Sequence, residues 1–232
     1  KGSPLAIGHG DGEMFVGSDA IALAPMTDQI TYLEEGDIAV LTRTSLEIRD
    51  AAGSLANRDQ RTIKMDSARV DKSGYKHFMA KEIAEQPTVL QGALAYYIGD
   101  NGVVLPDPGL DFTQVERMTL VACGTAYYAC MVAKYWFEQV ARLPIEIDVA
   151  SEFRYREPPV TKGTVALFVS QSGETADTLA ALRNVADQEF VASLVISNVD
   201  NSSLVRESDL VFLTQAGIEI GVASTKAFPA QL

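Results

Sequence analysis

The chain has 232 residues, enough for one large or two small domains, and its 47% apolar and 22% charged content is usual for a folded protein. The net charge of −12 argues against nucleic acid or an anionic membrane surface as a partner, because neither attracts an acidic protein. Two cysteines and two histidines are too few for a disulfide framework, argue against a structural zinc site, and fit a reducing, cytoplasmic setting. No apolar run of about twenty residues occurs, so no transmembrane helix is expected.

Residues 1 to 74 predict short antiparallel strands with little helix. The strand candidates are separated by turn-forming segments and lie at 4–7, 14–17, 30–33, 38–41 and 46–49. A short helix over 20–23 is expected to stop at Pro25, and residues 50–53 are expected to form a hairpin bend. The segment is short for a complete domain, and the chain does not begin with methionine. We therefore expect it to be the end of a longer domain.

Residues 75 to 112 are interpreted as a helical connector. A helix is predicted over 75–86, where Lys81 and Glu85 form an i,i+4 pair. Pro87 is expected to begin a second helix that runs to about Tyr97, because proline suits the first helical turn better than the interior. Glycine and proline clusters then end the helical region.

From residue 113 onward the pattern changes to alternating strands and helices. Apolar strands are predicted at 118–122, 145–149, 165–169, 191–196 and 210–213. Helices are predicted between them at 126–141, at 151–156, from 176 onward and at 204–207. Apolar strands separated by helices indicate an α/β fold with a doubly wound parallel sheet, which binds ligands beyond the carboxyl ends of its strands. The aromatic face of the helix over 126–141 is interpreted as core or a domain interface.

The segment after the predicted strand at 165–169 has the composition of an anion site. Three hydroxyls, an amide and a glycine follow that strand, at Ser170, Gln171, Ser172, Gly173 and Thr175. A strand, a tight turn and a helix start gather free backbone N–H groups at the positive end of a helix. The alternative is an ordinary Ser/Thr helix cap. We favour the anion site because a cap needs fewer polar side chains.

Two further turns are expected at the same edge of the sheet, at 123–125 and at 221–226. Together the turns favour a phosphorylated small molecule over a nucleotide, because neither nucleotide-binding glycine motif occurs. Cys123 is read as a small buried side chain in preference to a nucleophile at a helix start. Lys226 could bind phosphate or form an imine, but a lysine in a first helical turn is expected to face solvent. Glu174 is expected to favour the helix dipole.

These motifs resemble the glutamine:fructose-6-phosphate aminotransferase (glucosamine-6-phosphate synthase) family over essentially the whole chain. The matching segments are CGT at 123–125, ASEFRYR at 150–156, SQSGETADT at 170–178, SLVRESD at 203–209 and EIGVASTKAF at 219–228, with upstream matches at 2–5, 18–19, 33–37 and 79–83. The serine-rich turn alone would indicate only a sugar-isomerase (SIS) domain. The upstream matches make the resemblance specific to this family.

The resemblance implies three parts. Residues 1–74 would be the C-terminal part of an α+β glutaminase domain of the N-terminal-nucleophile type, 75–112 a helical linker, and 113–232 a first SIS domain, truncated at its C-terminal end. Asp19 would bind the α-amino group of glutamine. The sugar phosphate, fructose 6-phosphate or glucosamine 6-phosphate, would be bound by Thr125, Ser170, Gln171, Ser172, Thr175, Val222 and Ser224. The family often has serine where this chain has Ala126, which removes one possible hydroxyl contact.

The family aminates fructose 6-phosphate with ammonia from glutamine and isomerises the product to glucosamine 6-phosphate. Its nucleophilic cysteine, imine-forming lysine, catalytic glutamate and catalytic histidine would lie outside residues 1–232. The resemblance therefore implies no catalytic residue in this chain, no metal and no organic cofactor, and a homodimer for the whole enzyme. The alternative is a sensor in which an SIS-type domain only recognises a sugar phosphate, although no output module is visible in the sequence.

Overall fold

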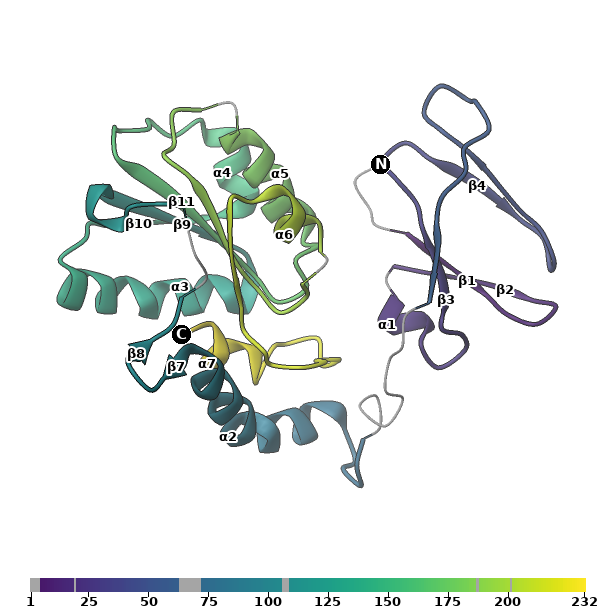
Figure 1. The fold of residues 1–232 in the computed structure, drawn as a ribbon, viewed down its shortest axis with the longest axis horizontal. Coiled ribbons are helices and arrows are strands. Elements are labelled where there is room, and N and C mark those ends of the chain that lie inside the picture. Colours follow the sequence, from purple (N-terminus) through teal and green to yellow (C-terminus); the bar gives the residue numbers. More distant parts are fainter. Residues whose placement is uncertain (1–4, 19, 63–71, 106–108, 187, 201) are drawn as a thin grey trace. The chain divides into compact units, whose positions relative to one another are not determined.

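The computed structural model describes residues 5–18, 20–62, 72–105, 109–186, 188–200 and 202–232. The chain forms two compact units, Lys1–Asp71 and Lys72–Leu232 (Figure 1). Among the described residues, no helix combines the length and the apolar character needed to cross a bilayer.

The first unit is built on a four-stranded antiparallel sheet. Its strand order is β2-β1-β3-β6, with β1 at Ala6–His9, β2 at Met14–Gly17, β3 at Gln29–Tyr32 and β6 at Gln60–Thr62. The sheet packs against α1 (Ala20–Leu23) through a small apolar cluster. A separate hairpin joins β4 (Ile38–Leu41) to β5 (Leu46–Arg49). The predicted strands are confirmed, with ends shifted by up to two residues, but β6 was missed because it is polar and fully exposed.

An ion pair holds the turn that precedes β4. Asp37 accepts a hydrogen bond from the backbone N–H of Glu34 at 2.8 Å. The guanidinium of Arg58 donates to both oxygens of Asp37, at 2.9 Å and 2.8 Å. This bidentate contact holds the pKa of the Asp37 carboxyl below its ordinary value, because it stabilises the ionised form.

The second unit begins with one continuous helix, α2 (Phe78–Tyr97), which carries Pro87 in its interior. The prediction of two helices divided at Pro87 is therefore wrong. A proline inside a helix removes one ladder hydrogen bond and strains the preceding turn. Contacts on both sides of Pro87 offset this cost: Glu82 binds a distant loop, and the Tyr97 hydroxyl donates to the carbonyl of Leu213 at 2.8 Å. A short hairpin, β7 (Ile98–Gly99) and β8 (Gly102–Val103), follows.

The core of the second unit is a five-stranded parallel sheet in the order β10-β9-β11-β12-β13. The strands are β9 (Arg117–Ala122), β10 (Ile145–Val149), β11 (Thr164–Ser170), β12 (Ser193–Ser197) and β13 (Leu210–Leu213). All five predicted strands are confirmed, and those at 145–149 and 210–213 have the predicted bounds. The second strand in the sequence, β10, lies at the edge of the sheet, and the first, β9, lies between β10 and β11. The winding of the sheet therefore changes direction between β9 and β11.

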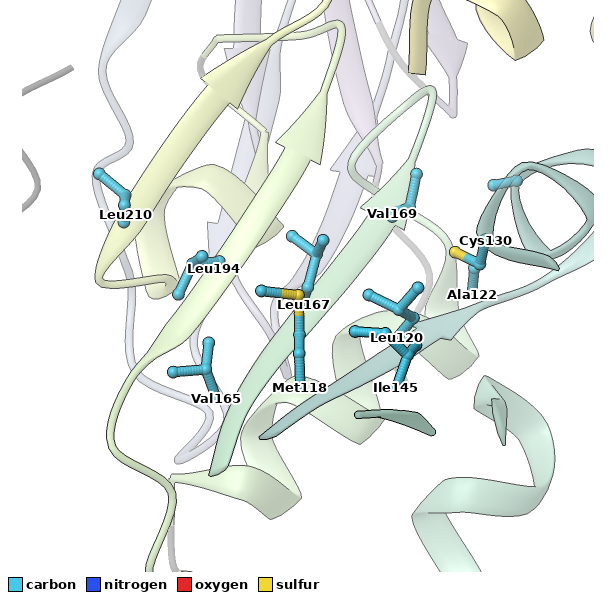
Figure 2. Close-up of a cluster of buried hydrophobic side chains, with 11 residues drawn as sticks. Met118, Leu120, Ala122, Cys130, Ile145, Val165, Leu167, Val169, Leu194 and Leu210 are labelled. Atoms are coloured by element: carbon cyan, nitrogen blue, oxygen red, sulfur yellow. The ribbon is translucent and has the colours of Figure 1, made fainter. Parts of the chain in front are cut away.

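Helices cover both faces of this sheet, as the doubly wound prediction requires (Figure 1). On one face, Ala126 and Cys130 of α3 (Gly124–Trp136) join an apolar cluster to which all five strands contribute side chains. Cys130 lies beside Ala122 of β9 in this cluster (Figure 2). Burial raises the pKa of the Cys130 thiol to about 12, so this side chain is neutral at physiological pH. On the other face lie α4 (Ala150–Arg156), α5 (Ala176–Val185) and α6 (Ser203–Glu207).

The helix predicted over 126–141 differs from the observed one at both ends. The α-helix begins at Gly124 and gives way to a π-helical turn over Phe137–Ala141, which Arg142 ends in a left-handed conformation at φ 56. The aromatic residues of this segment divide between two environments. Tyr127 packs against the core, whereas Tyr128, Tyr135 and Trp136 are exposed in this chain.

We expect Arg58→Met to return the pKa of Asp37 toward its ordinary value near 4. The native pKa is lowered, so the pair stabilises the fold above pH ~4 and this contribution is lost as the pH falls through the native pKa. NMR titration of the Asp37 carboxyl carbon measures the shift directly. The matched control is Arg61→Met on the exposed strand β6. An unchanged Asp37 titration in the Arg58 variant would contradict the assignment.

Candidate functional site

The carboxyl ends of the parallel strands form one polar edge of the second unit. Val169 of β11 pairs with Ala122 of β9, Ser170 pairs with Ser197 of β12, and Ser197 pairs with Leu213 of β13. Neighbouring strands therefore end at nearly the same level. The turns that follow them, which begin at residues 123, 171, 198 and 214, lie side by side along this edge.

The β9–α3 and β11–α5 turns flank the point where the winding of the sheet reverses. Doubly wound sheets bind ligands in the crevice outside this point. Thr125 lies in the first turn of α3 and is half-buried, and Gly124 before it takes a left-handed conformation at φ 58. Cys123 is partly buried and packs against the apolar cluster on the α4 and α5 face, which supports reading it as a small core side chain.

The β11–α5 turn is held by its own hydroxyl groups. Ser170 is buried, and its Oγ accepts a hydrogen bond from the backbone N–H of Gly173 at 3.1 Å and lies 3.0 Å from the hydroxyl of Thr175. Ser172 Oγ accepts from the N–H of Glu174 at 3.2 Å. A hydroxyl can accept and donate at once, so these bonds fix the turn without using up its donors. Gln171, Ser172 and Thr175 remain half-buried at the edge.

Only glycine fits at position 173, because the backbone is left-handed there and no room is left for a side chain. Its φ is +66, a left-handed value that side chains rarely adopt. A Cβ at this position would overlap Ser202 Oγ and lie 2.9 Å from Ser197 Oγ. The turn therefore lies directly against the segment that follows β12.

Glu174 makes a contact that the sequence did not predict. It precedes α5, where a carboxylate was expected to favour the helix dipole without having to point at the ligand. Its Oε1 also accepts a hydrogen bond from the backbone N–H of Ser203, the first residue of α6, at 2.7 Å. The backbone N–H of Leu204 also donates to the carbonyl of Gly173. Glu174 thus ties two turns together.

Asn198 is a bridging residue that the sequence analysis missed. Its backbone N–H donates to the carbonyl of Gln171 at 3.2 Å. Its side-chain oxygen accepts from the Thr214 hydroxyl and the Ala216 N–H, and its amide group donates to the carbonyl of Gly217 at 2.6 Å. Its place directly after the buried strand β12 was the one sign in the sequence that Asn198 lies at the polar edge. Asn198 connects the β11–α5 turn to the loop after β13.

The loop over residues 214–226 is organised by carboxylates. Glu219 accepts hydrogen bonds from the hydroxyl of Ser224 at 2.8 Å and from the backbone N–H of Thr225 at 2.7 Å. Val222 is fully exposed at the tip of the loop. The structure thus gives Ser224 an internal partner and leaves Val222 exposed.

Helix α2 supplies two more carboxylates to this loop. Glu82 is almost fully buried and accepts from the backbone N–H of Ile220 at 2.6 Å and of Gly221 at 3.0 Å. Glu85 accepts a hydrogen bond from the ammonium of Lys226 at 2.7 Å. The prediction that Lys226 faces solvent is wrong, because this ion pair satisfies the charge and α7 (Ala227–Gln231) packs beside α2 (Figure 1).

An apolar cavity of about 400 Å³ lies between α3, the sheet and the last residues of the chain. Its lining includes Ala129, Cys130, Trp136 and Leu232 but none of the predicted site residues. Asp19, predicted to bind glutamine, lies outside the described residues. Within the described ranges, no group of three or more His, Cys, Asp and Glu side chains is arranged to hold a metal ion.

Comparison with known proteins identifies close relatives along the whole chain. Glutamine–fructose-6-phosphate aminotransferases (isomerizing) from Brucella abortus and Bradyrhizobium diazoefficiens are 56% and 57% identical to it over 100% of its length. The chain spans 38% of each of these relatives. It therefore corresponds to about two fifths of their length.

Solved structures match about two thirds of the chain. The C-terminal domain of glucosamine-fructose-6-phosphate aminotransferase from Francisella tularensis is 50% identical, with a TM-score of 0.67 over 69% of this chain and 46% of that one. A glucosamine-6-phosphate deaminase from Thermotoga maritima is 22% identical, with a TM-score of 0.53 over 66% of this chain and 44% of that one, and shares the fold alone. The family model described as the SIS domain matches residues 111–232, which is more than half of the sequence, and the chain therefore belongs to the SIS-domain family.

Proposed function

We propose that this chain is part of a glutamine:fructose-6-phosphate aminotransferase and that its second unit binds the sugar phosphate. The observation that carries the proposal is the 54–57% identity to enzymes of that name over the whole chain, upstream segments included. The SIS-family match covers only residues 111–232 and would by itself fit other proteins of this family. Because residues 1–110 also match the aminotransferases, we favour this enzyme over other proteins with an SIS domain.

The same identity supports a division of labour along the chain. We assign residues 1–74 to the C-terminal part of a glutaminase domain of the N-terminal-nucleophile type, 75–112 to a linker, and 113–232 to the first SIS domain. In this assignment Asp19 binds the α-amino group of glutamine. The active whole enzyme is a homodimer.

The phosphate group of fructose 6-phosphate would bind at the β11–α5 turn. Ser172, Gln171 and Thr175 are half-buried donors on this turn, and the backbone N–H groups at the start of α5 add the positive end of a helix. Ser170 is buried, but its hydroxyl keeps a donor for the ligand if Thr175 donates in the bond between them. Thr125 would complete the site from across the crevice.

The sugar ring would then extend toward the loop after β13. Val222 is exposed and can cover an apolar face of the ring. Ser224 donates to Glu219 in the absence of ligand, and its hydroxyl oxygen retains acceptor capacity for a sugar hydroxyl. These residues bind and orient the substrate, whereas the residues that transfer ammonia and isomerise the sugar belong to other parts of the enzyme.

Ser172→Ala should weaken the binding of fructose 6-phosphate by about 1–3 kcal/mol, because a hydroxyl donor to the phosphate is lost. Isothermal titration of the chain with fructose 6-phosphate measures the change. The matched control is Ser208→Ala, whose hydroxyl donates to the carbonyl of Leu204 at the end of α6, away from the polar edge. Equal affinity of the Ser172 variant and the unaltered chain would rule out the role assigned to Ser172.

Gly173→Ala should weaken the same binding by about tenfold or more, because the added methyl group strains a left-handed residue and displaces Ser202. Gly102→Ala separates the two causes. Gly102 also has a positive φ, of 110, but no atom lies within 4 Å of a Cβ placed there. We expect that variant to lose stability and to bind normally. Tight binding by the Gly173 variant would show that the turn does not hold the phosphate.

The purified chain of 232 residues should neither hydrolyse glutamine nor form glucosamine 6-phosphate, because the groups that perform both reactions are assigned to other segments. Product assays for glutamate and for glucosamine 6-phosphate, run at high protein concentration, test this. A full-length relative provides the positive control. Turnover by the chain alone would place catalytic residues inside it and would contradict the assignment.

A further inference from the structure

We infer that Glu82 is a positioning residue for the candidate sugar loop, residues 219–225, although it lies on helix α2 and outside the region matched by the SIS-family model. The Glu82 carboxylate bonds two consecutive residues of this loop. One carboxylate oxygen accepts hydrogen bonds from two consecutive backbone N–H groups, those of Ile220 at 2.6 Å and Gly221 at 3.0 Å. The second oxygen lies 3.2 Å from the N–H of Gly221.

Because Glu82 is buried, its carboxylate needs these hydrogen bonds. The residue is 2% exposed, so its carboxylate has little access to water and depends on the loop for its hydrogen bonds. The loop depends equally on Glu82, because its two N–H groups are paired with a side chain and not with a helix or strand. Bonds between a carboxylate and N–H groups are about twice as strong as neutral ones.

The bonded residues immediately precede the residues expected to meet the sugar. Gly221 is followed by Val222, and Ser224 lies two residues further along, where Glu219 binds it from within the loop. The conformation of 222–224 is therefore set between two carboxylates, one inside the loop and one on α2. Gly221 also leaves the space that the carboxylate fills, since a Cβ there would lie 2.5 Å from Glu82 Oε2.

In this arrangement α2 helps to position the binding edge and is not only a connector. It rests on the proposed function for the identity of the ligand, but not for the role of Glu82 in holding the loop. The two can therefore be tested separately, by amide hydrogen exchange and by ligand binding.

Amide exchange followed by NMR tests the loop. In Glu82→Ala, exchange at Ile220 and Gly221 should rise by about ten- to hundredfold relative to sheet amides such as those of Val121 and Phe168, because both carboxylate bonds are lost. Glu82→Gln keeps one acceptor oxygen and should fall between the unaltered chain and the alanine variant. Such graded rescue is not expected if Glu82 only fills space.

Tyr97→Phe is the matched control on the same helix. It removes the bond from α2 to the carbonyl of Leu213 and leaves the loop contacts in place. Its exchange rates at Ile220 and Gly221, relative to the sheet, should stay within about twofold of the unaltered chain. If Glu82→Ala does not fold, Gly221→Ala replaces it, because the added methyl group displaces the carboxylate from the loop.

Titration with fructose 6-phosphate gives the second readout. The dissociation constant should rise about tenfold in Glu82→Ala, less in Glu82→Gln, and not in Tyr97→Phe. If the loop amides lose protection but the affinity is unchanged, Glu82 does not position the sugar site and the inference is wrong. If the unaltered chain binds no fructose 6-phosphate, the proposed function fails, and amide exchange alone tests the role of Glu82. Loss of protection confined to the loop in Glu82→Ala then supports Glu82 as the residue that holds the loop. Unchanged protection overturns that role.

Discussion

The common register of β9, β11, β12 and β13 is the constraint on which the second unit depends. Each strand is covered on both faces by helices, so a slip of one residue would turn core side chains to the wrong face. The strands must therefore end where they do, and the polar turns that follow them must share one edge. The arrangement of hydroxyl and amide groups at that edge follows from the packing of the apolar core.

An acidic protein can build an anion site if its carboxylates face inward. Glu174, Glu219 and Glu82 all lie at the polar edge and accept hydrogen bonds from backbone N–H groups. Those of Glu174 and Glu82 come from another segment, and that of Glu219 from its own loop. Their charges are used to fix the loops. The groups left at the half-buried surface of the β11–α5 turn are neutral hydroxyls and an amide. The net charge of −12 is therefore compatible with a site for a phosphate ester, because the field at the site is set by local donors.

Local patterns in the sequence predicted the elements that a pattern of apolar residues marks. The strands at 145–149 and 210–213 carry such patterns and were predicted with the observed ends. The errors arose where a distant contact overrides a local preference. Pro87 stays inside α2 because contacts before and after it hold the helix, and Lys226 is buried because Glu85 reaches it from 141 residues away. The sequence predicted that residues 170–175 form a polar turn. It could not predict the hydrogen bonds from this turn to Ser203 and Leu204, because they join residues about 30 positions apart.

The contact between Glu82 and the loop could not be predicted from the residues around Glu82 alone. On an exposed helix, Lys81, Glu82 and Glu85 look like an ordinary solvated face. The loop at 219–225, however, has many N–H groups and no strand or long helix to accept their hydrogen bonds. A buried carboxylate must find hydrogen-bond donors, and Glu82 takes two from this loop, the N–H groups of Ile220, 138 residues away, and of Gly221. Glu219, inside the loop, accepts from the N–H of Thr225. The helix that precedes the sheet in sequence therefore belongs to the polar edge in structure.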